Sequence, residues 1–155
     1  SALNCLADNK KLARISKTPG RTTEINFFEV EEGYKLLDLP GYGFAKSGQS
    51  RTKDWGPLLG EYFANRKALN GVLIFMDIRH PLKPIDLEMI KLCESFDINY
   101  VTVLTKSDKV SKNIEAKTIQ QVSNATNAIE ILAISSLKKI GFEKLRQVLI
   151  GFKNE

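Results

Sequence analysis

The chain has 155 residues, 43% of them hydrophobic and 26% charged, a composition that fits one globular domain over residues 1–155 and excludes a disordered or fibrous protein. Two cysteines are too few for a disulfide framework, and the longest apolar run, Val72–Met76, is far shorter than the ~20 residues that span a bilayer. We therefore expect a cytoplasmic protein without a membrane partner, and the net charge of +5 points only weakly to an anionic partner.

The first half of the chain is predicted to hold two helices separated by a β-hairpin. Ser1–Asp8 has leucines at helical spacing and no capping residue before it. Two segments rich in aromatic and aliphatic residues, Glu24–Val30 and Tyr34–Leu39, flank a short Glu-Glu-Gly turn and predict a hairpin. The glycines and serines of Pro40–Thr52 predict a loop, and the apolar spacing in Lys53–Leu69 predicts a helix.

From residue 71 onward, strand-like and helix-like segments alternate. The predicted strands are Val72–Met76, Tyr100–Leu104 and Ile129–Ile134, and the predicted helices are Asp86–Phe96, Ile114–Asn127 and Phe142–Phe152. Because such alternation is typical of parallel sheets, we predict an α/β fold of three layers, with a mostly parallel sheet and helices on both faces. In the first of these helices we expect Leu87, Ile90 and Cys93 to face inward.

An Asp-Leu-Pro-Gly motif follows the second predicted strand, at Asp38–Gly41. A carboxylate at a strand end, followed by a glycine whose amide can approach closely, suits a Mg²⁺ site that faces a terminal phosphate. The alternative is an ordinary strand-to-turn exit, in which Asp38 only caps the turn.

A second polar motif, Thr105-Lys106-Ser107-Asp108, follows a buried strand. The Asp108 carboxylate can accept both donors of a guanine edge, and a site built for such donors discriminates sharply against bases that lack them. The aliphatic stem of Lys106 can lie over the base plane. The alternative is a polar loop with an Asx turn.

The remaining signals are weak one by one. Ser135-Ser136-Leu137 follows the last strand, Thr22 precedes the hairpin, and each has an ordinary loop or capping interpretation. The only histidine, His80, is expected to have a structural loop role, and Asp77 and Arg79 are expected to fix that loop by a charge-assisted hydrogen bond. Carboxyl ends of parallel strands meet at one edge, so we expect the strand-end motifs to form one site.

The order Thr22, DLPG, TKSD and SSL resembles the conserved elements of a translation-factor-related (TRAFAC) P-loop GTPase. Four segments more narrowly resemble the bacterial EngB family: KTPGRTTEINFFEV (Lys17–Val30), LLDLPGYGFAK (Leu36–Lys46), MDIRHPLK (Met76–Lys83) and VLTKSDKVSKN (Val103–Asn113). The resemblance covers essentially the whole chain and implies a P-loop GTPase domain.

This resemblance implies GTP or GDP as ligand, Mg²⁺ as cofactor, and hydrolysis of GTP to GDP and phosphate. Thr22 and Asp38 would hold Mg²⁺, Gly41 would meet the γ-phosphate, and Lys106 and Asp108 would hold guanine. The full set of nucleotide-contacting residues that it implies is Gly20, Arg21, Thr22, Thr23, Glu24, Asp38, Leu39, Pro40, Gly41, Thr105, Lys106, Ser107, Asp108, Ser135 and Ser136. No residue is assigned to the catalytic step.

Two features depart from the general GTPase pattern. Tyr42 follows the DLPG glycine, where Ras-type enzymes have a water-orienting glutamine, so we expect slow intrinsic hydrolysis or help from a partner. No G-x-x-x-x-G-K-[ST] phosphate loop occurs, and the chain begins Ser1-Ala2-Leu3-Asn4, which resembles the start of the helix that follows this loop in the family. We therefore expect the P-loop and its strand to precede Ser1 in the complete protein, and the chain from Ser1 alone to bind GTP poorly.

The implied partner is the large ribosomal subunit or its RNA, with a role in subunit assembly and in normal cell division and septation, for a protein expected to be a monomer. Five cations, Lys10, Lys11, Arg14, Lys17 and Arg21, lie in one loop without acidic residues and can contact RNA phosphates. The alternative is that they only solubilise that loop. The competing function is that of an α/β binding scaffold that holds no nucleotide. Such a scaffold would have no need for Lys106 and Asp108 as guanine-binding residues.

Overall fold

The computed structural model describes residues 5–6, 26–31, 34–38, 60–61, 63–65 and 69–152, with residues 26–31 and 34–38 described as backbone alone. The chain divides into two compact units, residues 1–50 and 51–155. In the first unit, Cys5 and Leu6 are helical, within the helix predicted for Ser1–Asp8.

The first unit contains the predicted hairpin. Strands β1 (Asn26–Glu31) and β2 (Tyr34–Asp38) pair antiparallel, with Asn26 opposite Asp38. The pairing shifts between Glu29 and Glu31, which places a bulge beside the turn. The aromatic and aliphatic content of the two segments explains why they form strands. Asp38, the predicted metal ligand, is therefore the last residue of β2.

The second unit is built on a parallel sheet in the order β3-β4-β5. Its strands are β3 (Val72–Asp77), β4 (Tyr100–Thr105) and β5 (Glu130–Ala133). The register pairs Asp77 with Thr105 and Leu104 with Ala133, so all three strands end at the same edge. The prediction of three parallel strands in this part of the chain is confirmed.

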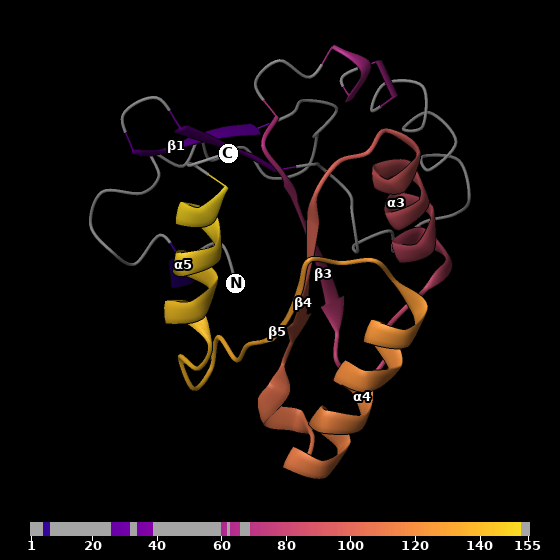
Figure 1. Cartoon of the computed structure of the whole chain (residues 1–155). Helices are drawn as coiled ribbons and strands as arrows, with labels where there is room; N and C mark the ends of the chain where they lie inside the picture. The colour runs from indigo at the N-terminus through magenta and orange to yellow at the C-terminus, as the bar shows by residue number, and fades with distance from the viewer. Residues whose placement is uncertain are drawn as a thin grey trace, which may run out of the picture. The chain divides into compact units, whose positions relative to one another are not determined.

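Helices cover both faces of this sheet (Figure 1). α3 (Pro84–Ser95) and α4 (Lys112–Ala125) lie on one side, where α3 packs against β3 and α4 against β5. α5 (Phe142–Gly151) lies on the other side. The predicted three-layer α/β architecture is therefore confirmed for this unit. None of the helices in the described ranges is long and apolar enough to cross a membrane.

Two helices begin earlier than predicted, because local capping interactions rather than the apolar spacing set their first residues. α3 starts at Pro84, a residue suited to the first helical turn, and Asp86 accepts a hydrogen bond from the Lys83 N–H at 2.9 Å. α4 starts at Lys112 because the Ser111 hydroxyl accepts from the Ile114 N–H at 3.3 Å. Both predicted starts were two residues too late, so the interpretation of residue 84 as loop was wrong.

The core of the second unit surrounds β4, which is buried from Tyr100 to Leu104. Ile90 and Cys93 of α3 are buried as predicted, but Leu87 is 46% exposed, so its predicted inward orientation was wrong. Helical spacing predicted an apolar stripe through Leu87, whereas the buried residues of α3 are Asp86, Met89, Ile90 and Cys93.

The helix predicted for Lys53–Leu69 is described only in part. Gly60, Glu61, Phe63 and Ala64 are helical, while Leu69 lies outside the helix, so the predicted end was too late. Phe63 is buried and its ring meets that of Phe96 edge to face, with centroids 6.1 Å apart. This contact joins the helical segment to the end of α3.

Candidate functional site

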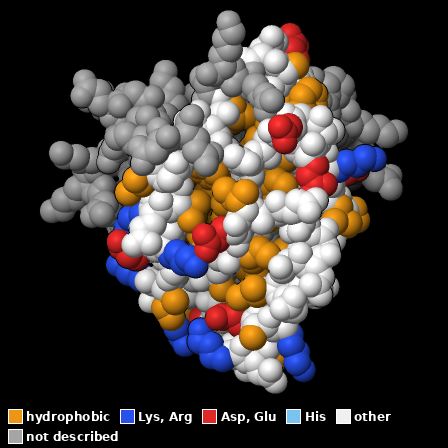
Figure 2. Space-filling view, viewed as in Figure 1, with side chains coloured by type: hydrophobic (Ala, Val, Ile, Leu, Met, Phe, Trp, Pro, Cys, Tyr) orange, Lys and Arg blue, Asp and Glu red, His pale blue; other side chains and the backbone are white. Residues whose placement is uncertain are grey.

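The carboxyl edge of the β3-β4-β5 sheet brings together two of the predicted polar segments, those after β4 and β5, with the end of β3 beside them. Asp77 ends β3, and Thr105 ends β4 with Lys106–Asp108 directly after it. Ser135 and Ser136 are the second and third residues beyond the end of β5. This edge lies at the lower end of the view in Figure 1. In Figure 2 the same end carries Lys and Arg side chains with acidic ones among them.

The segment after β4 makes a sharp and well-bonded turn. Lys106 has left-handed backbone angles, with φ 60° and ψ 38°, and Ser107–Lys109 form a single 3₁₀ turn. The Lys109 N–H donates to the Lys106 carbonyl at 2.9 Å, and the Ser107 N–H donates to the Ile134 carbonyl at 3.0 Å. The second bond ties the β4 loop to the chain just beyond β5.

Asp108 is held by Ser135. The Ser135 hydroxyl donates to the Asp108 Oδ1 at 2.5 Å and accepts from the Lys138 N–H at 3.1 Å. This hydrogen bond lowers the pKa of Asp108 below its usual value, so the carboxylate is ionised at neutral pH. The Ser135 N–H donates to the Ile140 carbonyl at 3.0 Å. Ser135 therefore acts on Asp108 through its side chain, while its own N–H is engaged within the chain.

Asp77 lies at the same edge, although the sequence predicts only a loop-fixing role for it. Arg79 donates to both oxygens of the Asp77 carboxylate, at 3.0 and 2.8 Å, as predicted. The Lys106 ammonium also donates to Asp77 Oδ2, at 2.9 Å. The bonds from Arg79 first, and then from Lys106, lower the pKa of Asp77 well below its usual range against the opposing effect of burial. The signal for this contact was a carboxylate at the end of the strand that neighbours β4.

His80 takes part in this turn through its backbone. Its N–H donates to the Asp77 carbonyl at 2.9 Å, and its side chain is exposed. This geometry agrees with the loop role expected for the residue.

Most residues predicted to bind phosphate or metal lie outside the part of the chain that the structure describes. Residues 20–24, which include Thr22, and residues 39–41 lie outside the described ranges, and Asp38 is described only as the last backbone position of β2. Among the residues whose side chains the structure describes, no three potential metal ligands of the His, Cys, Asp and Glu types lie together. The guanine half of the predicted site is thus the half that the structure brings together.

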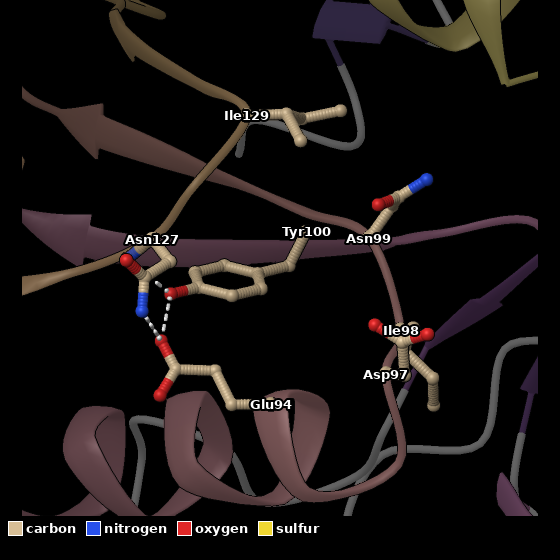
Figure 3. Close-up of a pocket in the computed structure, with 7 residues that line it drawn as sticks. All are labelled: Glu94, Asp97, Ile98, Asn99, Tyr100, Asn127 and Ile129. Atoms are coloured by element: carbon tan, nitrogen blue, oxygen red, sulfur yellow. Dashed lines mark hydrogen bonds between the residues drawn. The ribbon is translucent and has the colours of Figure 1, made fainter.

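A pocket of about 250 Å³ lies at the opposite edge of the sheet, where β4 begins (Figure 3). Its polar side chains bind one another: the Tyr100 hydroxyl donates to Glu94 at 2.7 Å, and the Asn127 amide donates to the same oxygen at 3.1 Å. The Asn127 N–H donates to the Tyr100 hydroxyl oxygen at 2.9 Å. Because these groups join the end of α3 to the starts of β4 and β5, the cluster has an evident structural role.

The fold of the chain is shared with solved structures of GTP-binding proteins. The structure is similar to a crystal structure of a probable GTP-binding protein engB, with a TM-score of 0.77 and 20% identity, over 97% of this chain and 90% of that one. It is also similar to elongation factor SelB from Methanococcus maripaludis in complex with a GTP analogue, with a TM-score of 0.66 and 19% identity, over 99% of this chain and 30% of that one. The chain has the α/β fold of P-loop GTPases.

Sequence comparison narrows the class to a family. The family described as 50S ribosome-binding GTPase matches residues 1–106. The chain is 45% identical to the probable GTP-binding protein EngB of Salmonella newport and 46% identical to that of Klebsiella pneumoniae, in each case over 100% of this chain and 76% of the relative. The chain therefore belongs to the EngB family of GTPases, which confirms the resemblance found in its motifs.

Proposed function

We propose that residues 1–155 form one G domain that binds GTP with Mg²⁺, hydrolyses it to GDP and phosphate, and acts as a molecular switch. The observation that carries the proposal is the fixed Asp108 carboxylate. It is ionised, oriented by Ser135 at 2.5 Å, and located on the sheet edge where ligands of α/β proteins bind.

In this proposal the segments after β4 and β5 read the base. Asp108 accepts the two N–H donors of the guanine edge, and the aliphatic stem of Lys106 covers the ring. Thr105 and Ser107 shape the loop through bonds to neighbouring segments: the Thr105 hydroxyl donates to the Met76 carbonyl at 3.2 Å. Ser135 orients Asp108, and Ser136 follows it in the segment that supports the base.

The phosphates and Mg²⁺ are assigned to the first unit. Thr22 and Asp38 offer a hydroxyl and a carboxylate, which are the hard oxygen donors that Mg²⁺ prefers. Bound there, Mg²⁺ would neutralise phosphate charge. Gly41 would donate its N–H to the γ-phosphate, and Tyr42 in place of glutamine makes intrinsic hydrolysis slow. The other residues proposed to contact the nucleotide here are Gly20, Arg21, Thr23, Glu24, Leu39 and Pro40.

The switch is proposed to act, as a cytoplasmic monomer, in assembly of the large ribosomal subunit and thereby in normal cell division and septation. The match to a family described as 50S ribosome-binding GTPase supports this assignment. The basic segment from Lys10 to Arg21 is the part of the sequence best suited to ribosomal RNA.

Nucleotide binding by the protein produced from its complete coding sequence tests the proposal. A fluorescent GDP analogue should bind and be displaced by GTP and GDP but not by ATP, and ITP, which lacks the 2-amino group of guanine, should compete poorly. Asp108→Asn should lose this selectivity and gain affinity for xanthosine nucleotides, because its amide can donate to the carbonyl that replaces the 2-amino group. No binding at all would favour the nucleotide-free scaffold instead, and equal displacement by ATP and GTP would refute guanine recognition by Asp108.

A further inference from the structure

The Asp77 carboxylate is a fixed acceptor at the edge of the proposed guanine site. Arg79 holds it with both its guanidinium and its backbone N–H, the latter at 3.0 Å. Two further bonds fix the adjoining backbone: the Ile78 N–H donates to the Thr105 carbonyl at 3.0 Å, and the Thr105 hydroxyl donates to the Met76 carbonyl at 3.2 Å. The bonds of Thr105 to the residues before and after Asp77 therefore fix the position of Asp77 relative to the start of the Lys106 loop.

Unlike the fixed Asp77 carboxylate, the Lys106 side chain is long and largely exposed. It is 56% accessible to solvent, whereas the Asp77 side chain is only 16% accessible. A lysine in this setting samples many rotamers, and holding it in one of them on ligand binding costs about 0.5–1.5 kcal/mol. The 2.9 Å contact between the Lys106 ammonium and Asp77 fixes the far end of that side chain before any ligand binds.

The pair does little for stability by itself. The lysine end of this ion pair is largely exposed, and an ion pair with an exposed, flexible partner adds little to folding. Closure of the turn over residues 77–80 does not require Lys106 either, since Arg79 and the His80 N–H already make bonds within it. The contact between Asp77 and Lys106 therefore matters chiefly for where the lysine side chain lies.

We propose that Asp77 is a positioning residue for guanine-nucleotide binding: its carboxylate holds the Lys106 ammonium so that the lysine stem is aligned for the base in advance. This inference rests on the proposed role of Lys106 in covering the guanine ring. Because the base is common to GTP and GDP, Asp77 affects the affinity for both nucleotides alike. Asp77 touches no reacting group in this account, so the rate at saturating GTP is independent of it.

A double-mutant cycle on the protein from its complete coding sequence tests this inference. Asp77→Asn keeps the shape of the side chain but removes its charge, and Lys106→Met keeps the apolar stem but removes the ammonium. Each variant should weaken the affinity for GDP and for GTP by about two- to tenfold, the cost of ordering one flexible side chain. Asp77→Asn should have no further effect in the Lys106→Met background, and it should raise KM for GTP while leaving kcat unchanged.

Matched variants separate positioning from loop structure. Arg79→Met breaks the other half of the Asp77 contacts and should weaken nucleotide affinity less than Asp77→Asn does. Glu115→Gln breaks the Lys112–Glu115 ion pair of α4, which has a similar length of 3.0 Å, and should leave affinity unchanged. Should Asp77→Asn fail to fold, Lys106→Met probes the same pair from its exposed partner and must by itself show the loss.

Three results would overturn the inference. Asp77→Asn could weaken binding equally with and without the lysine ammonium, which would assign it a role independent of Lys106. Affinity could instead rise in Asp77→Asn, which would make the carboxylate a competitor of the nucleotide. Lys106→Met could also bind like the wild type. In all three cases the wild type still binds GDP selectively, whereas a wild type without selectivity refutes the proposed function itself.

Discussion

Removal of the Tyr100 hydroxyl should lower the stability of the protein and leave its nucleotide affinity unchanged, because Tyr100 lies at the end of β4 opposite the proposed guanine site. Tyr100→Phe keeps the ring that fills the core at the start of β4 and deletes one oxygen. That oxygen donates to Glu94 at 2.7 Å and accepts from the Asn127 N–H at 2.9 Å, so both partners lose a bond (Figure 3). The variant therefore loosens the junction of α3, β4 and β5 without creating a large cavity.

The expected cost is about 1–2 kcal/mol in the free energy of unfolding. The lower figure corresponds to one net hydrogen bond, and the higher adds part of the penalty for an unpaired N–H. The cost stays below the upper limit for buried groups because Glu94 and Asn127 are exposed and water can replace the lost oxygen. Nucleotide affinity should not change, since Thr105 lies five residue steps along β4 from Tyr100, a distance of ~17 Å.

The difference between wild type and variant should also depend on pH in a defined direction. Burial first, and then the hydrogen bond to Glu94, raises the pKa of Tyr100 from 10.0 to about 12. A pKa raised on folding contributes stability that is complete below the unfolded value of 10.0 and is lost as pH rises toward about 12. The stability gap between wild type and Tyr100→Phe should therefore be constant between about pH 7 and pH 10 and shrink above pH 10.

Urea unfolding at a series of pH values measures both effects, with equal m-values as the check that only stability has changed. The comparison is made above pH 7, because the Tyr100 hydroxyl lowers the pKa of Glu94 and the two proteins therefore also differ in acid, where Glu94 titrates. Above pH 7, titration of groups that do not contact Tyr100 affects the wild type and the variant alike and cancels in their difference. A Tyr100→Phe variant with the urea midpoint of the wild type, or a gap that widens above pH 10, would contradict the role given to this hydroxyl. A large loss of GDP affinity would contradict the separation of the two ends of β4.

Two further variants probe the site and the core. Ser135→Ala removes the donor that orients Asp108, and should weaken GDP binding about tenfold to a hundredfold in a fluorescence titration, as expected for loss of a hydrogen bond to a charged group. Ser95→Ala, which removes an exposed hydroxyl bonded to the Leu92 carbonyl, is its control, and equal losses in both would contradict the prediction. Cys93 is fully buried, and burial raises the pKa of its thiol to about 12. In a Cys5→Ser background, a water-soluble disulfide reagent at pH 8 should label Cys93 only after unfolding in urea, and fast labelling of the folded protein would contradict its burial.

The sequence by itself determined the order and type of the elements in the described ranges. Alternation of apolar strands with amphipathic helices from Val72 onward has one common solution, a parallel sheet covered on both faces. Motif order added the family, because Thr22, DLPG, TKSD and SSL stand in the order that resembles a TRAFAC GTPase, and further segments resemble the EngB family. Element ends were less well predicted where a cap decided them, as at Pro84 and Ser111, since a local hydrogen bond can shift a helix start without changing its apolar pattern.

Only the tertiary structure decided which side chains meet. Parallel pairing brings Asp77 opposite Thr105, and this places the Asp77 carboxylate within 2.9 Å of the Lys106 ammonium, 29 residues along the chain. The folded chain likewise brings the Ser135 hydroxyl to the Asp108 carboxylate, 27 residues apart in sequence. It also leaves Leu87 46% exposed, although the helical spacing of Leu87 fits a buried stripe. Periodicity fixes the direction of a side chain relative to its own element. Its partner depends on which neighbouring element lies in that direction, and that is a property of the folded chain.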